Sequence, residues 1–229
     1  MVRLLCGVLI CSAFMMVVSG CSKSVPAPIP TYSSIAFFHG SPSISALNVF
    51  LDGTQLNSSA FEYSSFSGAL SANSGNRNIK FTSFTSNLTL IDTTVSLVNL
   101  KSYTIFVINN KAIIKPLMTQ DEGELASPST NLMIRFIHLS PDAPSAYVVL
   151  LGETAALVPA QTYQKASAFL EIPTKTYTFE VRATSDNHVI ATTASLNAQA
   201  GIFYTVALYG YSTPPSGNSN KIAAKVLAY

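Results

Sequence analysis

Apolar and polar positions in this chain follow the pattern of short β-strands. After residue 31, runs of about four to eight apolar or alternating residues are separated by clusters of Gly, Asn, Ser and Pro. None of these runs sustains the 3.6-residue period of an amphipathic helix. β-Branched and aromatic residues fill them, as in YTIFVI from Tyr103 and YTVALY from Tyr204. The pattern predicts an all-β protein with a sandwich or barrel architecture.

The same pattern occurs twice along the chain. Residues 35–53, IAFFHGSPSISALNVFLDG, align without a gap with residues 134–152, IRFIHLSPDAPSAYVVLLG. His39 meets His138 at a shift of 99 positions (138 − 39 = 99). Later segments match in the same order, including YTIFVI with YTVALY and KAIIK with KIAAK. Repeats of this length indicate two domains, because the repeats of solenoids are about 20 to 50 residues long.

The two copies predict tandem immunoglobulin-like β-sandwich domains at residues 31–118 and 131–229. Between them, residues 119–130 read TQDEGELASPST, which is acidic and contains Gly and Pro, so we expect a linker there. Tyr103 and Tyr204 open the penultimate strand of each copy. Immunoglobulin-like sandwiches often keep a corner tyrosine at that place.

The N-terminus has the composition of a secretory signal peptide. Arg3 precedes an apolar run over residues 4–18, and small residues follow up to Cys21. The run has 15 residues, whereas a membrane-spanning helix needs about 20. The sequence therefore predicts a signal peptide at residues 1–20.

The end of this segment, VSGC at residues 18–21, resembles the bacterial lipobox. That resemblance implies that Cys21 becomes the first mature residue and carries palmitate-type acyl chains, with residues 21–30 as a proline-rich tether. An ordinary secretory signal is the alternative. The expected location is the cell envelope, lipid-anchored at the outer membrane, with the periplasmic and the surface face both open.

Composition further limits the kinds of partner and site that we expect in this chain. The chain has 13 Lys and Arg against 11 Asp and Glu, and only 10% of it is charged, so it offers no basic stripe for nucleic acid. Two of its three cysteines precede Cys21 and would leave with the signal, so no thiol remains for a disulfide, a zinc site or a nucleophile. We expect no metal and no cofactor. The carboxylates Asp121, Glu122 and Glu124 are expected to be solvated in the linker.

The stretch IHLSPDAPS brings His138, Ser140, Pro141 and Asp142 close together, as a turn or as a catalytic trio. A strand stops at the Ser-Pro pair because proline cannot donate to a ladder. Asp142 can then accept a hydrogen bond from the backbone two residues on. On this interpretation the polar residues close a structural turn.

The first copy helps to separate the two interpretations. It keeps His39, Ser41 and Pro42 but has Ser43 where the second copy has Asp142. A turn tolerates Asp or Ser, whereas a triad would lose a member. We therefore expect a structural turn in both copies, with each histidine neutral, partly buried and hydrogen-bonded to its own turn.

The strand after the second turn is apolar on both faces. Tyr147, Val149 and Leu151 alternate outward from the expected core, which makes them a possible interaction face. We expect the other domain to cover this face, ahead of a partner protein or a glycan.

The motif H-x-S-P-D-A-P at residues 138–144, a following strand that ends in Gly, a second copy and a lipobox together resemble a bacterial envelope family. It consists of domains of unknown function, often in tandem, found mostly in lipoproteins. The resemblance covers residues 33–229 and implies an immunoglobulin-like sandwich and an envelope location, but no activity.

The sequence therefore predicts a non-enzymatic binding or structural module, lipid-anchored in the cell envelope, with an envelope protein or a glycan as partner. Two alternatives stay open. One is a glycan or ester hydrolase that uses His138, Ser140 and Asp142. The other is an accessory subunit of an outer-membrane complex.

Overall fold

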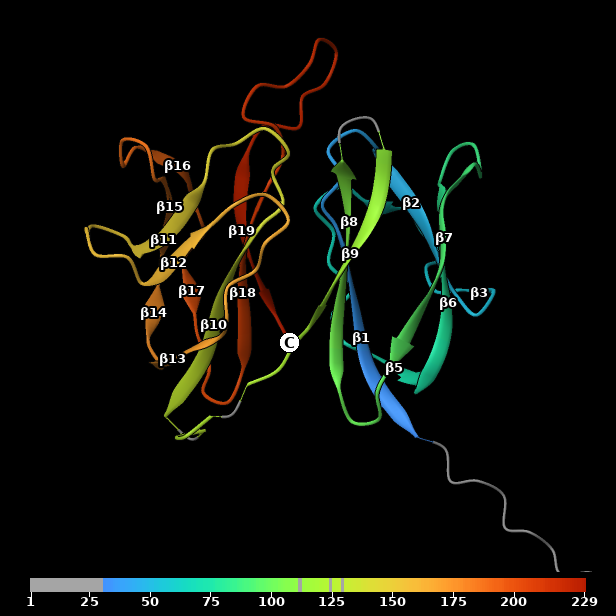
Figure 1. Cartoon of the computed structure of the whole chain (residues 1–229), viewed down its shortest axis with the longest axis horizontal. Coiled ribbons are helices and arrows are strands. Elements are labelled where there is room, and N and C mark those ends of the chain that lie inside the picture. The colour runs from blue at the N-terminus through green and yellow to red at the C-terminus, as the bar shows by residue number, and fades with distance from the viewer. Residues whose placement is uncertain (1–30, 111–112, 124, 129) are drawn as a thin grey trace, which may run out of the picture. The chain divides into compact units, whose positions relative to one another are not determined.

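Figure 1 shows the computed structural model of the chain, which describes residues 31–110, 113–123, 125–128 and 130–229. Within these ranges every regular element is a β-strand, and none of the residues lies in a helix. The predicted all-β fold is confirmed. Residues 31–229 form one compact unit. The predicted signal peptide, the candidate lipidation site Cys21 and the tether lie outside the described residues.

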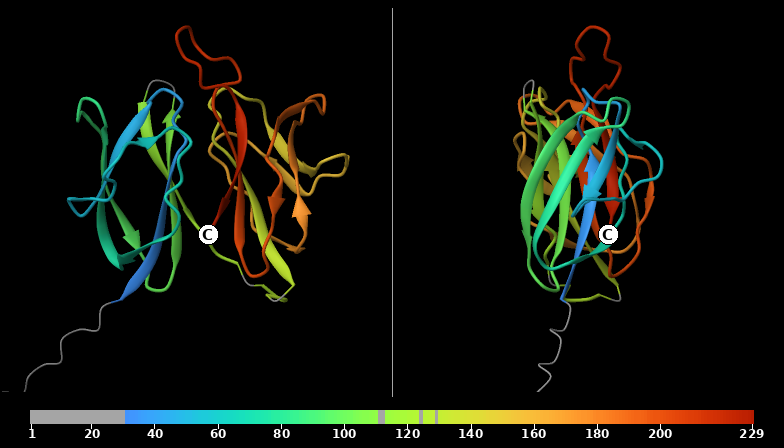
Figure 2. Two further views of the ribbon diagram at one scale, coloured as in Figure 1. Left: turned by 180° about the vertical axis from the view of Figure 1, so that it is seen from behind. Right: turned by 90° about the vertical axis from the view of Figure 1, so that its right-hand side faces the viewer.

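The first copy of the repeat forms two facing sheets (Figures 1 and 2). One sheet has the order β5-β1-β8-β9 and the other β3-β2-β6-β7, with β4 also paired to β2. β1 and β8 run parallel, and the other pairs run antiparallel. The strands are β1 (Tyr32–His39), β2 (Ala46–Leu51), β3 (Thr54–Gln55), β4 (Phe61–Glu62), β5 (Leu70–Asn73), β6 (Gly75–Ser83), β7 (Thr89–Leu97), β8 (Ser102–Asn110) and β9 (Ile113–Gln120).

The second copy repeats this topology. Its sheets have the orders β13-β10-β18-β19 and β12-β11-β15-β16, with a small pair β14-β17, and β10 again runs parallel to β18. The strands are β10 (Asn131–His138), β11 (Ala146–Leu150), β12 (Val158–Gln161), β13 (Leu170–Pro173), β14 (Thr176–Tyr177), β15 (Phe179–Ala183), β16 (Val189–Thr192), β17 (Leu196–Asn197), β18 (Phe203–Tyr209) and β19 (Ala223–Ala228). The domain boundaries themselves stay a prediction.

Each copy has its own core between its two sheets, as strand alternation requires. In the first copy, Phe37 from β1 meets Phe81 from β6 edge to face, with ring centroids 5.8 Å apart. In the second copy, Phe136 from β10 and Phe179 from β15 belong to the corresponding cluster, and both are fully buried. The period-two pattern of the sequence therefore selects these inward residues.

A third apolar cluster joins the two copies. Its members point away from both sandwich cores and come from the outer faces of β1 and β8 in one copy and of β10, β18 and β19 in the other. The cluster contains Phe38, Phe106, Ile108, Ile137, Leu139, Ala207, Tyr209 and Leu227. The central strands of both copies are thus buried on both faces, which explains why YTIFVI and YTVALY read as nearly continuous apolar runs.

Equivalent lysines of the two copies each donate a hydrogen bond to the other copy across this contact. Lys115, on β9, donates to Gln164 Oε1 of the second copy at 2.7 Å. Lys225, on β19, donates to the carbonyl oxygen of Ser64 in the first copy at 2.9 Å. Both acceptor residues have a left-handed backbone, with φ of 64° at Ser64 and 69° at Gln164. The two copies therefore meet through equivalent surfaces, as the subunits of a two-fold dimer do.

The tyrosines at the two corners, Tyr103 and Tyr204, are each hydrogen-bonded to the backbone of their own copy. The hydroxyl of Tyr103 accepts from the N–H of Val98 at 3.2 Å, and that of Tyr204 from the N–H of Gln199 at 2.9 Å. Each bond ties the start of the penultimate strand to the backbone five residues upstream. Both tyrosines are buried, so these hydroxyls have little access to water.

Replacing Tyr204 by Phe removes this bond and leaves the Gln199 N–H without its acceptor. We expect the free energy of unfolding to fall by about 1 to 2 kcal/mol, measured by urea denaturation. The matched variant Tyr103→Phe should lose less, because its bond is longer (3.2 against 2.9 Å). Unchanged stability in both variants would contradict a role for these hydroxyls.

Candidate functional site

The candidate site lies where β10 ends and the chain turns toward β11. His138 is fully buried, and its Nε2 lies 2.9 Å from the carbonyl oxygen of Pro144, a hydrogen bond within its own turn. Ser140 is also fully buried, and its hydroxyl donates to the carbonyl oxygen of Gly210 at 2.6 Å. The histidine and the serine therefore bond to different backbone carbonyls.

Asp142 does not close the Asx-type turn that the sequence predicts. Its two carboxylate oxygens instead accept from the backbone N–H groups of Ser212 and Thr213, each at 2.8 Å. Those donors lie in the loop between β18 and β19, 70 residues away in sequence. The local prediction is wrong because the residue two positions on is Pro144, which has no N–H to donate, and the loop supplies two N–H groups instead.

This geometry differs from that of a catalytic triad. A triad needs the nucleophile hydrogen-bonded to the base, and the base oriented by a third group. Here the hydroxyl of Ser140 is directed at Gly210, and its only contact with the trio is a long 3.4 Å approach to Asp142. A serine without exposed surface is also out of reach of a polymeric or ester substrate.

The equivalent turn in the first copy uses a different set of partners. Ser41, which is fully buried, donates to Asn109 Oδ1, and Asn109 Nδ2 donates to the hydroxyl of Ser43 at 2.8 Å. The same amide group also donates to the hydroxyl of Tyr211 at 3.1 Å. Asn109 was not among the predicted site residues, although an amide at the end of the apolar strand YTIFVIN is a polar group that needs partners.

The β18–β19 loop, residues 210–222, connects the two turns. Gly210 and the backbone of residues 212–213 bond to the second turn. Asn218 and Asn220 donate their amide groups to the carbonyl oxygen of Pro42 in the first turn, at 2.8 and 2.7 Å. Gly210 has φ of +90°, and a Cβ there would collide with the Lys221 carbonyl, so this loop requires glycine. The duplicated polar residues thus serve to fasten one loop to both copies.

The two buried histidines differ in their partners. Neither ring nitrogen of His39 has a hydrogen-bond partner, so the predicted bond to its own turn is absent. The ring lies between Phe61 and Tyr63, with centroid distances of 6.4 and 6.0 Å. Burial lowers the pKa of His39 to about 3. Burial also lowers the pKa of His138, and the bond to Pro144 partly opposes this.

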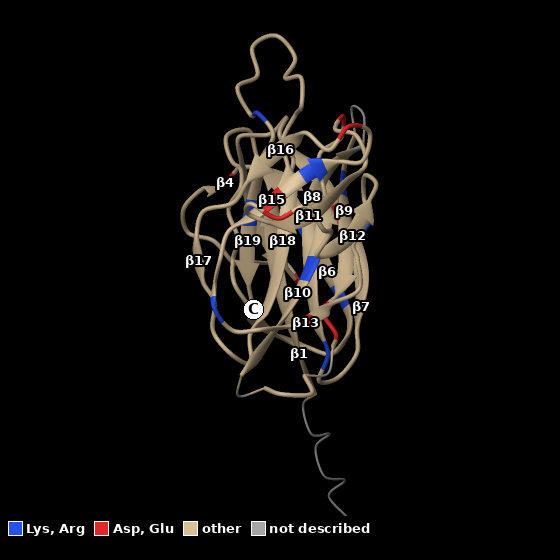
Figure 3. Cartoon of the chain, turned by 90° about the vertical axis from the view of Figure 1, so that its left-hand side faces the viewer, with Lys and Arg blue, Asp and Glu red and all other residues tan. Residues whose placement is uncertain are grey.

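A buried ion pair lies across the contact between the copies. Arg135 on β10 and Asp121, just after β9, have side chains that are 3% and 2% exposed, with Nη2 and Oδ1 2.5 Å apart. Thr104 donates to the other carboxylate oxygen at 2.6 Å, and Arg135 Nε donates to Thr205 at 2.8 Å. The guanidinium also lies 4.5 Å from the centre of the Phe169 ring. Charged residues are otherwise sparse over the strands (Figure 3).

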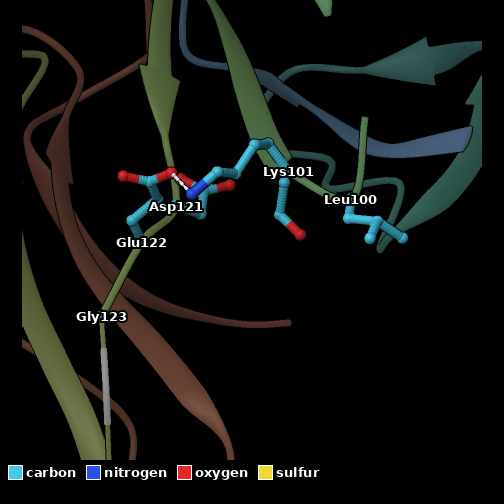
Figure 4. A pocket seen from close by; sticks show the side chains of 6 residues that line it. Leu100, Lys101, Asp121, Glu122 and Gly123 are labelled. Carbon is cyan, nitrogen blue, oxygen red and sulfur yellow. Dashed lines mark ion pairs between the residues drawn. The ribbon is translucent and has the colours of Figure 1, made fainter. Parts of the chain in front are cut away.

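The burial of Asp121 contradicts the expectation that the carboxylates of the linker are solvated. Asp121 is buried because the charged Arg135, which stands between Ile134 and Phe136 in a doubly buried strand, needs a counter-charge. Glu122 pairs with Lys101 at the exposed surface (Figure 4), and this contact lowers the pKa of the Glu122 carboxyl. Glu124 lies outside the described residues.

The exposed pair borders a hollow of about 480 Å³ beside Leu100, Ser102 and Gly123. Figure 4 shows the side chain of Lys101 extending toward Glu122, while Leu100 extends the other way. Both carboxylates of the hollow are already paired, Asp121 with Arg135 and Glu122 with Lys101. They are therefore not placed as a free acid and base.

The predicted interaction face is not a continuous exposed patch. Val149 is fully buried, Leu151 is 56% exposed and lies beyond the end of β11, and the half-buried Tyr147 donates its hydroxyl to Asn187 of the same copy at 3.0 Å. The ion pair of Arg182 with Glu180 stands on the neighbouring strand, directly opposite Tyr147 and Val149. Cover by the other domain was the wrong expectation, because the copies meet through β10, β18 and β19.

In the part of the chain that the structure describes, no group of three or more His, Cys, Asp or Glu side chains could hold a metal ion. Within the same residues, no helix has the length and hydropathy that crossing a membrane requires.

Burial of the histidines predicts a loss of stability in acid. Their folded-state pKa values lie below the ordinary value of 6.5, so the unfolded chain binds protons first as the pH falls. The free energy of unfolding should be fully retained above pH 6.5 and should decrease below it. For His39 the loss is up to about 1.4 kcal/mol per pH unit and continues to about pH 3, and His138 adds to it because its pKa is also lowered. Urea unfolding at a series of pH values measures the slope. His39→Phe should remove part of it, and NMR titration of both rings near pH 6.5 would contradict their burial.

Breaking the buried ion pair predicts a large loss of stability. Asp121→Asn leaves the Arg135 charge buried without compensation, so the free energy of unfolding should fall by about 3 to 5 kcal/mol. The double variant Asp121→Leu/Arg135→Met should lose clearly less than the sum of its single variants. Lys101→Met, at the exposed pair, is the matched control and should have little effect. Additive losses in the double variant would show that the two charges are not coupled.

Comparison with known proteins gives one family, and the distantly similar solved structures include a carbohydrate-binding module and a candidate cell adhesion protein. Residues 33–149, just over half of the chain, match the family described as domain of unknown function DUF4397. No curated protein matches the sequence. A family 26 carbohydrate-binding module from Eubacterium rectale Amy13K, solved with maltoheptaose, is 8% identical, with a TM-score of 0.25 over 86% of this chain and 96% of that chain. A candidate cell adhesion protein from Bacteroides eggerthii DSM 20697 is 10% identical, with a TM-score of 0.24 over 87% and 95%.

At these TM-scores neither structure supports an argument about function. The family match runs from β1 into β11, and so covers the first copy and the start of the second. It includes the turn residues His39 and His138 and the ion pair between Asp121 and Arg135. The chain belongs to the DUF4397 family of domains of unknown function.

Proposed function

We propose that this protein is a non-enzymatic lipoprotein of the cell envelope, anchored at the outer membrane by acyl chains on Cys21, that acts as a binding or structural module. An envelope protein or a glycan is the proposed partner. The accessory-subunit version differs only in that this partner is a larger outer-membrane complex.

One observation carries the non-enzymatic part of the proposal. The side chains that could have formed a catalytic trio are all engaged in fastening loops: His138 to Pro144, Ser140 to Gly210, and Asp142 to the backbone of residues 212–213. In the first copy, Ser41 and Ser43 are engaged with Asn109 in the same way. A group that already holds a buried backbone together cannot move a proton to a substrate without breaking that contact.

The second support is the variety of contacts that join the two copies. An apolar cluster, a buried ion pair, two lysine bonds and the β18–β19 loop all join them. Such a scaffold suits a protein that presents loops at a fixed spacing, because binding residues are often on loops held by a rigid framework. The proposed lipid anchor would place this framework at a membrane.

Metabolic labelling with an alkyne fatty acid tests the anchor. The full chain expressed in a Gram-negative host should incorporate the label and sediment with outer membranes, while Cys21→Ser should lose both properties. Cys11→Ser is the matched control, because Cys11 lies in the predicted signal peptide and should leave labelling unchanged. Labelling that persists in Cys21→Ser would overturn the proposal.

The same purified protein also tests the hydrolase alternative. The purified protein should show no turnover of ester substrates or envelope polymers above the rate of a Ser140→Ala variant. Turnover that disappears in Ser140→Ala, with the stability of that variant preserved, would replace the binding-module proposal with an enzyme.

A further inference from the structure

An exposed apolar tip lies at the end of the first copy where the described chain begins. The turn between β7 and β8 is hydrogen-bonded to the start of β1: the N–H of Leu100 donates to the carbonyl oxygen of Tyr32 at 2.8 Å, and Ser33 donates to that of Val98 at 2.7 Å. Tyr32, Val98 and Leu100 are 50%, 56% and 85% exposed. We call these three residues the apolar tip.

Leu100 is unusual in two respects. It is the most exposed of the large apolar side chains in the described chain, and its backbone is left-handed, with φ of 62°. A left-handed backbone is costly for leucine, and glycine or asparagine usually occupies such a position. Folding alone would therefore favour a different residue here, which points to a role outside the fold.

The second copy contains the same turn without the apolar residues. The N–H of Gly201 donates to the carbonyl oxygen of Asn131 at 2.8 Å, which matches the bond from Leu100 to Tyr32. Gly201 also has a left-handed backbone, with φ of 78°. Gln199 takes the place of Val98, since each donates its N–H to the corner tyrosine of its own copy. One turn thus exists in two versions, Tyr-Val-Leu in the first copy and Asn-Gln-Gly in the second.

We propose that the apolar tip rests in the surface of the lipid bilayer that holds the acyl chains of Cys21. This inference rests on the proposed lipid anchor and adds a second membrane contact to it. Nine residues separate Cys21 from Thr31, so a fully extended chain keeps Tyr32 within about 40 Å of the anchored cysteine. The apolar version of the turn therefore belongs to the copy, and to the end of that copy, that follows the anchored cysteine along the chain.

The chemistry of the tip fits the boundary between headgroups and acyl chains. Tyrosine prefers this interface because its ring is apolar and its hydroxyl is polar, and valine and leucine can bury beside it. Lys101, next to Leu100, has its charge matched by Glu122, and Figure 4 shows this pair extending away from the Leu100 side chain. No unpaired charge of this turn is therefore carried into the lipid with Leu100.

The chain contains no tryptophan, so a single introduced tryptophan reports its own surroundings. We would reconstitute the full acylated protein in vesicles of phosphatidylethanolamine and phosphatidylglycerol that contain a brominated phosphatidylcholine. Tryptophan at the tip, as Leu100→Trp or as Val98→Trp, should be quenched about twofold or more strongly than Leu88→Trp. Val98→Trp keeps the test valid if tryptophan is not tolerated in the left-handed backbone of residue 100.

Leu88 is the matched control because it is also exposed, at 64%, but lies at the other end of the β6–β7 pair. Weak and equal quenching at positions 88, 98 and 100, in protein that carries the acyl label and floats with the vesicles, would overturn the membrane contact and leave the lipoprotein proposal intact. Protein that never acquires the label would overturn both.

A second variant set exchanges the two versions of the turn. Tyr32→Trp alone should be quenched, whereas Tyr32→Trp/Val98→Gln/Leu100→Gly should lose most of that quenching. The substituted residues already occupy the same turn in the second copy, so the fold should be retained. Equal quenching in both variants would show that Val98 and Leu100 do not contact lipid.

Discussion

Burial of the central strands on both faces is the constraint on which this structure depends. β1, β8, β10 and β18 each contribute one face to a sandwich core and the other to the contact between the copies. A polar group on such a strand has no water on either side and must find a partner in the protein. This requirement explains why Arg135 and Asp121 form a buried pair with threonine neighbours, and why His39, which has no partner, is stable only in its neutral form.

The same constraint gives the duplicated His-x-Ser-Pro residues their role. They end the doubly buried strands, so their polar atoms lie where the strand leaves the apolar interior, and the β18–β19 loop supplies partners to both turns. The loop belongs to the second copy alone, because β8 and β9 are connected by only residues 111–112. The two copies meet through equivalent surfaces, but this loop and the Arg135–Asp121 pair make the contact between them asymmetric.

The proposed functions depend on how firmly these contacts join the two copies. A junction whose turn residues are bonded to the backbone does not offer them as catalytic groups to a substrate, but it does hold the loops, the β7–β8 turn and its counterpart between β17 and β18 in fixed positions. The difference between Leu100 and Gly201, at equivalent places in the fold, indicates that the first copy changed its surface while keeping its backbone. A lipid anchor at Cys21 would give that difference a purpose, since it would keep the first copy near the membrane.

The sequence by itself determined the all-β class, the inward residues such as Phe37 and Phe136, and the two corner tyrosines, because strand alternation and turn residues act locally. The buried pairing of Arg135 with Asp121 was not predicted, because no local pattern relates the two residues. Only the tertiary structure decided the partners of Asp142, the burial of Val149 and which faces of the two copies meet. These depend on contacts between residues about 40 to 180 positions apart, and the same alternating pattern is compatible with many such pairings.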